Sequence, residues 1–190
     1  MRAFVALVPP VEALEDLDTF LEVRREVGDL RWVQADQVHA TLAFLGDVPD
    51  RRLDDLVERL GRAAAKRTAF PTAIAGGGAF PDAARARVVW AGLQLEEDGR
   101  TELDRLATGC RAAANRAGVP VDGTRFRPHL TVARTRAPHD VSAWVRLLDT
   151  YRGPAWVAEE MALVASYLGE GARGRPRHQV VETFALTPGT

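Results

Sequence analysis

The sequence predicts an α+β fold of antiparallel sheets, arranged as two similar lobes that face each other across a cleft. Strand-like and helix-like segments are mixed along the chain, and several neighbouring strands have short connections. This pattern favours antiparallel pairing over a doubly wound parallel sheet. An apolar strand carrying His-x-Thr occurs at His39 and again at His129, and 129 − 39 = 90 residues is close to half of the 190-residue chain. One motif per half indicates two similar lobes.

Apolar periodicity, caps and turn residues define the expected elements of the first half. They are a strand at 2–8, a helix at 10–27, a short strand at 31–33, the first motif strand at 38–45, a helix at 51–66 and a strand at 70–75. We expect the last strand to end at the glycine run 76–78. Neither Lys-Ser/Thr nor a helix follows these glycines, so we interpret them as a bulge or wide turn and not as a phosphate-binding loop.

The second half shows a similar succession of elements. They are a strand at 87–93, a helix at 98–117, the second motif strand at 128–134, a helix at 140–150 and closing strands at 155–168 and 178–187. No linker or low-complexity tract separates the halves. We therefore expect residues 1–190 to form a single domain of two intimately packed lobes.

Composition excludes several classes of protein. The net charge of −1 argues against a protein that coats long nucleic acids. No run of about 18 apolar residues is present, so we expect no membrane span. The single cysteine, Cys110, excludes an internal disulfide and is typical of a protein from the reducing cytoplasm. Its alanine-rich helical surroundings predict a small core residue.

The two motifs place a histidine and a threonine on one face of each strand. Residues at i and i+2 of a strand point the same way and lie roughly 7 Å apart, which applies to His39 with Thr41 and to His129 with Thr131. A polar pair on an apolar strand destabilises the fold unless it is hydrogen-bonded. The repetition of that cost in both halves indicates a shared task.

Three tasks can be weighed for these four side chains. A zinc site usually takes three protein ligands, often with Cys or a carboxylate, and neither motif supplies one. A nucleophilic threonine needs an orienting partner that the sequence does not reveal. Paired acid–base catalysis at phosphorus needs a base and an acid on opposite sides, which two histidines supply at neutral pH. The hydroxyls of Thr41 and Thr131 would then bind the non-bridging oxygens.

The motifs His39-Ala40-Thr41-Leu42 and His129-Leu130-Thr131-Val132 resemble the two His-x-Thr-x signatures of the 2H phosphoesterase superfamily. Further stretches are similar, in order, to its RNA 2′,3′-cyclic phosphodiesterase branch, also called the 2′-5′ RNA ligase family. They are Arg2-Ala3-Phe4-Val5-Ala6, Trp32, Thr41-Leu42-Ala43-Phe44-Leu45-Gly46, Gly78-Ala79-Phe80-Pro81, Val89-Trp90 and Pro128-His129-Leu130-Thr131-Val132-Ala133-Arg134.

This resemblance implies two antiparallel-rich sheets with helices outside, related by a pseudo-twofold around a central, metal-independent site. It implies hydrolysis of a terminal RNA 2′,3′-cyclic phosphate to a 2′-phosphomonoester, without a cofactor. By the same resemblance, His39 is the proton donor to the departing 3′ oxygen, and His129 is the proton acceptor that activates water. The reverse reaction would make a 2′-5′ linkage without ATP.

Arg134 matches the arginine that follows the family's second motif, where it would bind phosphate as a fork. Strict alternation puts it on the face opposite His129, so it reaches the cleft only if the strand ends or bulges. The corresponding residue of the first motif is Phe44, which suits either the core or stacking with a base. Arg125 and Arg127 are candidates for the RNA path. His139 and His178 have no partner pattern, and we interpret both as structural or surface residues.

We expect the partners to be RNA ends bearing 2′,3′-cyclic phosphate, or cyclic nucleotides, bound by a monomer with no membrane contact. Two other interpretations stay open at this point. One is a binding module that recognises phosphorylated RNA ends without cleaving them. The other is a 2H phosphodiesterase acting on another cyclic phosphate or on a 2′-5′ oligonucleotide.

Overall fold

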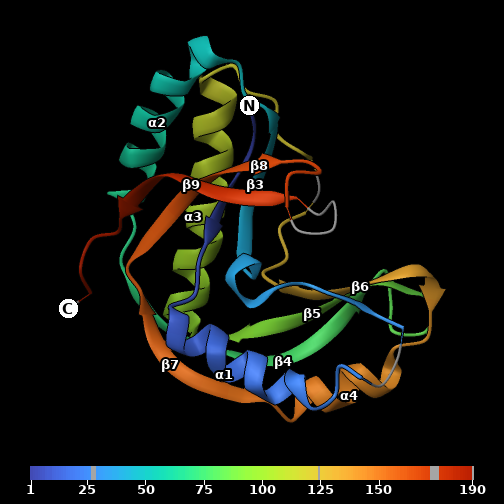
Figure 1. Ribbon diagram of the computed structural model, residues 1–190. Helices are drawn as coiled ribbons and strands as arrows, with labels where there is room; N and C mark the ends of the chain where they lie inside the picture. The colour runs from blue at the N-terminus through green and yellow to red at the C-terminus, as the bar shows by residue number, and fades with distance from the viewer. Residues whose placement is uncertain (27–28, 124, 172–175, 190) are drawn as a thin grey trace.

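The computed structural model of the chain describes residues 1–26, 29–123, 125–171 and 176–189 (Figure 1). Its helices are α1 (Val11–Glu22), α2 (Asp50–Ala64), α3 (Glu97–Arg116) and α4 (Ser142–Asp149), with a short 3-10 helix η1 (Ala35–Gln37). Its strands are β1 (Arg2–Leu7), β2 (Arg31–Trp32), β3 (Ala40–Asp47), β4 (Phe70–Phe80), β5 (Ala86–Gln94), β6 (Leu130–His139), β7 (Arg152–Ala158), β8 (Glu160–Tyr167) and β9 (Arg177–Ala185).

The strands form two antiparallel halves that meet at their motif strands. The strand order is β7-β4-β5-β6-β3-β1-β8-β9, with β2 paired to β6. β6 pairs over several residues with β5, as β3 does with β1, whereas β6 and β3 share the pair Ala40 and Leu130. Around this pair, β3 corresponds to β6, β1 to β5, β8 to β4 and β9 to β7. The predicted α+β fold with antiparallel pairing is confirmed, and its two halves join, within the described residues, in one nine-stranded sheet.

The helices lie outside the sheets and tie the halves together (Figure 1). α2 and α3 pack on each other and against strands of the β3 half, while α1 and α4 pack against strands of the β4 half. α1 follows β1 in the sequence but packs on β7, and α3 follows β5 but packs on β3. These two helices thus link the halves, whereas α2 and α4 pack on the half that they follow. One apolar cluster includes Leu17, Leu56, Leu106 and Leu148, one residue from each of the helices α1 to α4.

The glycine run does not end the fourth strand, contrary to the prediction. β4 continues through it to Phe80, with a register shift between Ile74 and Gly77 that agrees with the expected bulge. A Cβ atom at Gly77 would overlap the side chain of Leu148, and one at Gly78 would overlap the ring of Trp90. The glycines therefore make room for neighbouring side chains while the strand continues.

The predicted strand at 155–168 is two strands, which is a second correction. β7 pairs with β4 in one half, and β8 pairs with β1 in the other. The chain passes from one half of the sheet to the other at Glu159, between these two strands. The apolar run is nearly continuous across this corner, so its periodicity alone could not reveal the change of partner.

Helix boundaries follow burial of the apolar stripe. In α1 the side chains of Leu14, Leu17 and Leu21 are buried, whereas Val23 is 74% exposed and follows the helix end at Glu22. The helix predicted at 10–27 therefore ends earlier than expected, because residues 23–26 form a turn. Residue 27 lies outside the described residues. Within the described residues, no helix is long and apolar enough to cross a membrane.

Candidate active site

The two motifs lie where the halves of the sheet join. His39 immediately precedes β3, and His129 immediately precedes β6. The next residue of each motif, Ala40 or Leu130, forms the antiparallel pair between these strands. A backbone contact of neighbouring strands therefore joins two motifs that lie far apart in sequence.

The antiparallel register arranges the four motif side chains crosswise. In an antiparallel pair, the residue before the paired position on one strand lies opposite the residue after it on the other strand. His39 therefore lies toward Thr131, and Thr41 lies toward His129. Diagonal neighbours in such a pair are about 7–8 Å apart, which is the spacing this register implies for the two histidines. All four side chains are partly buried and share the face opposite the paired residues.

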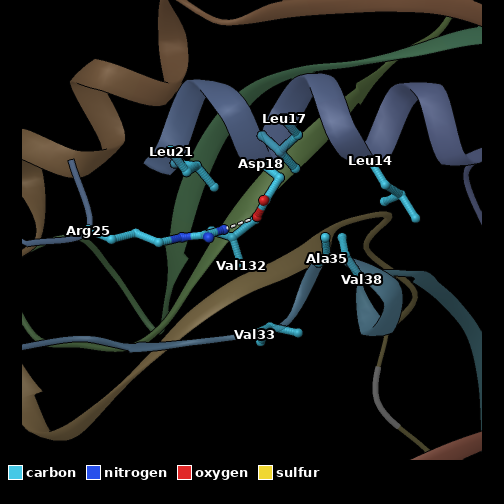
Figure 2. A pocket seen from close by; sticks show the side chains of 9 residues that line it. All are labelled: Leu14, Leu17, Asp18, Leu21, Arg25, Val33, Ala35, Val38 and Val132. Atoms are coloured by element: carbon cyan, nitrogen blue, oxygen red, sulfur yellow. Dashed lines mark hydrogen bonds and ion pairs between the residues drawn. The ribbon is translucent and has the colours of Figure 1, made fainter. Parts of the chain in front are cut away.

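The other face of the motif strands belongs to the core. Ala40 and Leu130 are 3% and 0% exposed, respectively. A small pocket of about 10 Å³ lies on this core side. Figure 2 shows it beneath α1, with the ion pair of Arg25 and Asp18. Its lining is Leu14, Leu17, Asp18, Leu21, Arg25, Val33, Ala35, Val38 and Val132. Val38 and Val132 adjoin the motif residues His39 and Thr131, so alternation separates this core pocket from the histidine face.

In both motifs, the backbone carbonyl two residues before the histidine holds the imidazole ring by a hydrogen bond. The Nδ1 atom of His39 lies 2.8 Å from the carbonyl oxygen of Gln37, and that of His129 lies 2.7 Å from the carbonyl oxygen of Arg127. A carbonyl only accepts hydrogen bonds, so Nδ1 carries the proton in each ring. Nε2 is then the nitrogen left to bind or exchange a proton with a ligand.

A bulge in each motif strand brings a later residue onto the histidine face. The pairing of β3 with β1 skips Leu42, and the pairing of β6 with β5 skips Val132. Each extra residue reverses the alternation. Phe44, which is 51% exposed, and Arg134, which is also exposed, therefore return to the side of the histidines. From the sequence, Arg134 was expected to reach the cleft only if its strand ended or bulged, and β6 does bulge before this residue.

Aromatic rings surround each histidine. Phe4 stacks on His39, with ring centroids 4.5 Å apart and an interplanar angle of 20°. Phe80 meets His129 edge-on at 4.8 Å, and Trp90 lies 6.2 Å from the same ring. Phe4 is buried in a small apolar cluster separate from the main core. These contacts restrict the rotation of both imidazoles.

Burial and positive charge lower the pKa of both histidines. Loss of solvent lowers the pKa of His39 from 6.5 to about 4, with smaller contributions from the charges of His178, His129 and Arg134. Loss of solvent also lowers the pKa of His129, and Arg134 adds to this effect. The hydrogen bond to the backbone carbonyl opposes the shift in each ring. Both imidazoles are therefore mainly neutral at pH 7, in a cationic environment suited to an anion.

A model of a known protein family matches the two sequence segments that carry the motifs. The family model described as LigT like Phosphoesterase matches residues 8–90 and 93–172. The first segment contains His39 and the second contains His129. The chain belongs to this family.

Relatives of this LigT-like phosphoesterase cover nearly its whole length. An RNA 2′,3′-cyclic phosphodiesterase of Aquifex aeolicus is 31% identical over 191 residues, covering 98% of this chain and 97% of the relative. One from Escherichia coli is 31% identical over 186 residues, with the same coverage. The crystal structure of E. coli LigT complexed with 3′-AMP matches with a TM-score of 0.75 and 30% identity, covering 98% of this chain and 97% of that one.

A third histidine of the phosphoesterase lies beside the pair. His178 on β9 is 5.3 Å from the ring of His39 and 5.0 Å from that of Phe4. The sequence carries no signal for this position, because it depends on the pairing of the β8–β9 hairpin with β1. His139, in contrast, is exposed at the end of β6, away from the motif histidines.

The loop before β6 carries the two arginines considered for RNA contact. Arg125 and Arg127 are both exposed. The guanidinium of Arg127 lies 6.0 Å from the Phe80 ring centroid. The backbone amide of Asp122 donates to the carbonyl oxygen of Phe44, which fastens this loop to the first motif strand. The loop therefore borders both motifs of the phosphoesterase.

Neither a thiol nor a metal cluster belongs to the arrangement in the described part of the chain. Cys110 is buried, as expected of a core residue, and its Sγ donates to Sδ of Met161 at 3.3 Å. Within residues 1–26, 29–123, 125–171 and 176–189, no three His, Cys, Asp or Glu side chains are grouped to hold a metal ion. The chemistry available at the histidine face is proton transfer by two imidazoles beside hydroxyl and guanidinium donors.

Proposed function

We propose that this phosphoesterase is an RNA 2′,3′-cyclic phosphodiesterase that hydrolyses a terminal 2′,3′-cyclic phosphate to a 2′-phosphomonoester. The observation that carries the proposal is the crosswise placement of two His-x-Thr motifs around the pair Ala40 and Leu130. It supports a site at which two imidazoles reach one phosphorus atom. The names of relatives that match nearly the full length support the choice of substrate.

In the proposed reaction, His129 accepts a proton from water while the water oxygen forms a bond to phosphorus. The bond from phosphorus to the 3′ oxygen breaks, and His39 donates its proton to that oxygen. The products are a 2′-phosphomonoester and a 3′-hydroxyl. Each step uses Nε2, since Nδ1 of both rings is engaged with a backbone carbonyl. No metal ion or cofactor takes part in this proposal.

The neighbouring side chains have separate roles in the proposal. The hydroxyls of Thr41 and Thr131 donate to the non-bridging oxygens, where negative charge accumulates in the transition state. Arg134 binds the same phosphate, which its position after the bulge supports. Phe44 offers an exposed ring for stacking with the terminal base. Arg125 and Arg127 contact the preceding RNA backbone.

The substrate supplies the charge that makes His39 a proton donor. In the free protein, burial holds the pKa of His39 near 4, so a neutral ring predominates at pH 7. A bound phosphodiester anion favours the imidazolium and raises this pKa. The same placement of His39 and His129 permits the reverse reaction, in which a 5′-hydroxyl attacks the cyclic phosphate to form a 2′-5′ linkage without ATP.

The wider proposal is a single domain of two packed lobes that works as a monomer in the cytoplasm. The shared apolar core supports the single domain, because it contains residues from all four named helices. The catalytic proposal does not depend on this wider part.

The decisive test is turnover of adenosine 2′,3′-cyclic phosphate and of an oligomer with a cyclic-phosphate end, in EDTA. We expect 2′-phosphate products from the natural protein. His39→Ala and His129→Ala should each lower kcat by about 10²- to 10⁴-fold, since each removes a proton-transfer group. His139→Ala is the matched control because His139 is exposed outside the motifs, and it should retain full activity.

Three results would contradict the proposal. Saturable binding without product indicates a module that only recognises RNA ends. Turnover confined to another cyclic phosphate or to 2′-5′ linked dimers indicates a different 2H substrate. Full activity in either histidine variant, with unchanged circular dichroism, removes the acid–base mechanism.

A further inference from the structure

We propose that His178 is a positioning residue that holds the ring of His39 in its reactive orientation. This inference rests on the proposed function of His39 and adds a third histidine to the site. His178 lies on β9, opposite Ser166 of β8. The β8 strand pairs with β1, which carries Phe4. The C-terminal hairpin is thus the element that delivers His178.

Three contacts together define the orientation of the His39 ring. Its Nδ1 donates to the carbonyl oxygen of Gln37 at 2.8 Å. Phe4 stacks nearly parallel to it, and His178 meets it at 5.3 Å with an interplanar angle of 74°. His178 also meets Phe4 at 5.0 Å and 75°. The three rings form a closed cluster, so removal of His178 frees one side of His39.

The choice of a histidine here is informative, because an apolar ring could pack in the same way. The Nδ1 atom of His178 is buried and has no hydrogen-bond partner among the described residues. A buried polar atom without a partner is unfavourable. The residue therefore introduces a polar cost that packing alone does not require, which favours a role in the site.

The electrostatic contacts support this role. Burial lowers the pKa of His178, while the charge of Asp36 on η1 acts in the opposite direction. A charged His178 lowers the pKa of His39, as His129 and Arg134 do. A neutral His178 consequently allows His39 to take up the proton that it must donate.

The second half of the molecule provides the internal comparison. Phe80 and Trp90 flank His129 there. Neither ring titrates, and the imidazole of His129 is the less shifted of the two motif histidines. A titratable ring is therefore placed against His39 alone, the histidine proposed to need a proton.

The test compares His178→Phe, which keeps a ring, with His178→Ala, which removes it. His139→Ala serves as a control that changes an exposed histidine. With adenosine 2′,3′-cyclic phosphate, we expect His178→Ala to lower kcat about 10- to 100-fold through a misplaced proton donor, with KM changed less than about three-fold. His178→Phe should recover part of kcat, because it restores the ring but not its polar atom, and His139→Ala should match the natural protein.

Proton and nitrogen NMR of the free protein supplies a second readout that needs no turnover. We expect a protected Nδ1–H signal for His39 in the natural protein and in His178→Phe, and its loss by exchange in His178→Ala. The pKa of His39 should rise in His178→Phe, because that substitution removes a neighbouring positive charge at low pH.

Unchanged kcat and an unchanged Nδ1–H signal in His178→Ala would overturn the proposal. A rise in KM alone would also overturn it, since this would indicate direct substrate contact. If the alanine variant unfolds, an unchanged His39 pKa in His178→Phe is the deciding negative result. Absence of turnover in the natural protein refutes the proposed function instead, and the NMR comparison still tests the contact.

Discussion

Ala40 on β3 pairs with Leu130 on β6, and this pair joins the two halves of the sheet. Each residue is buried, and each lies between the histidine and the threonine of its own motif. The pair thereby sets the relative position of four polar side chains on the opposite face. Stability of the core and geometry of the site are coupled at this point.

Shortening the Leu130 side chain tests that coupling. Leu130→Ala leaves a cavity at a fully buried position, so we expect the free energy of unfolding to fall by about 2–5 kcal/mol in urea denaturation. We also expect kcat to fall, because His129 and Thr131 flank the cavity. The exposed Leu168, at 62%, provides the control: Leu168→Ala should change the unfolding free energy by less than about 0.5 kcal/mol. Equal effects of the two substitutions would contradict the argument.

The pH dependence of hydrolysis follows from the lowered pKa values of the histidines. The pKa of His39 is about 4 in the free protein, and that of His129 is lowered below 6.5. Above both values the rings are neutral and His39 can no longer act as the proposed proton donor, so kcat/KM should decline with rising pH from below about pH 6.5. Bound phosphate raises the donor pKa, so the corresponding decline of kcat should occur at higher pH. Measurements of kcat and kcat/KM between about pH 4 and pH 9 will test both declines. If the two quantities decline at the same pH, bound phosphate does not raise the pKa of the donor.

Arg134 should contribute both binding and charge. Arg134→Ala removes the guanidinium that we propose binds the phosphate, and we expect kcat/KM to fall about 10- to 100-fold. The pKa values of His39 and His129 should rise, because the charge of Arg134 lowers both. Arg134→Lys should have an intermediate kcat/KM, since lysine keeps the charge but not the bidentate guanidinium.

Arg146→Ala, on the exposed side of α4, is the control. Equal activity of the two alanine variants would show that Arg134 lies outside the site.

Gly78 tests the close packing beneath His129. A Cβ atom at this position would overlap the indole of Trp90, which in turn lies 6.2 Å from His129. We expect Gly78→Ala to destabilise the protein by about 1–3 kcal/mol and to lower kcat. Thermal unfolding and tryptophan fluorescence will report both changes. Gly61→Ala in α2 is the matched control, because its Cβ meets only Phe184 at 3.7 Å and helix propensity favours alanine. A larger loss of stability in the control would refute the packing argument.

Much of this architecture is readable in the sequence because it depends on local patterns. The strand at β1, the helix at α3 and the mixed α+β class follow from periodicity and turns. His39, Thr41, His129 and Thr131 were identifiable from one repeated motif. The end of β4 was not, since glycines at 77 and 78 weaken a strand in isolation but here accommodate Leu148 and Trp90.

The sequence by itself determined which residues form the two motifs, that they occur once per half, and that an arginine follows the second. Only the tertiary structure decided the pairing of Ala40 with Leu130, the return of Arg134 to the histidine face and the place of His178. The physical reason is that register, bulges and contacts between rings depend on the partner strand. That strand lies far away in the chain, and local residue patterns carry no record of it.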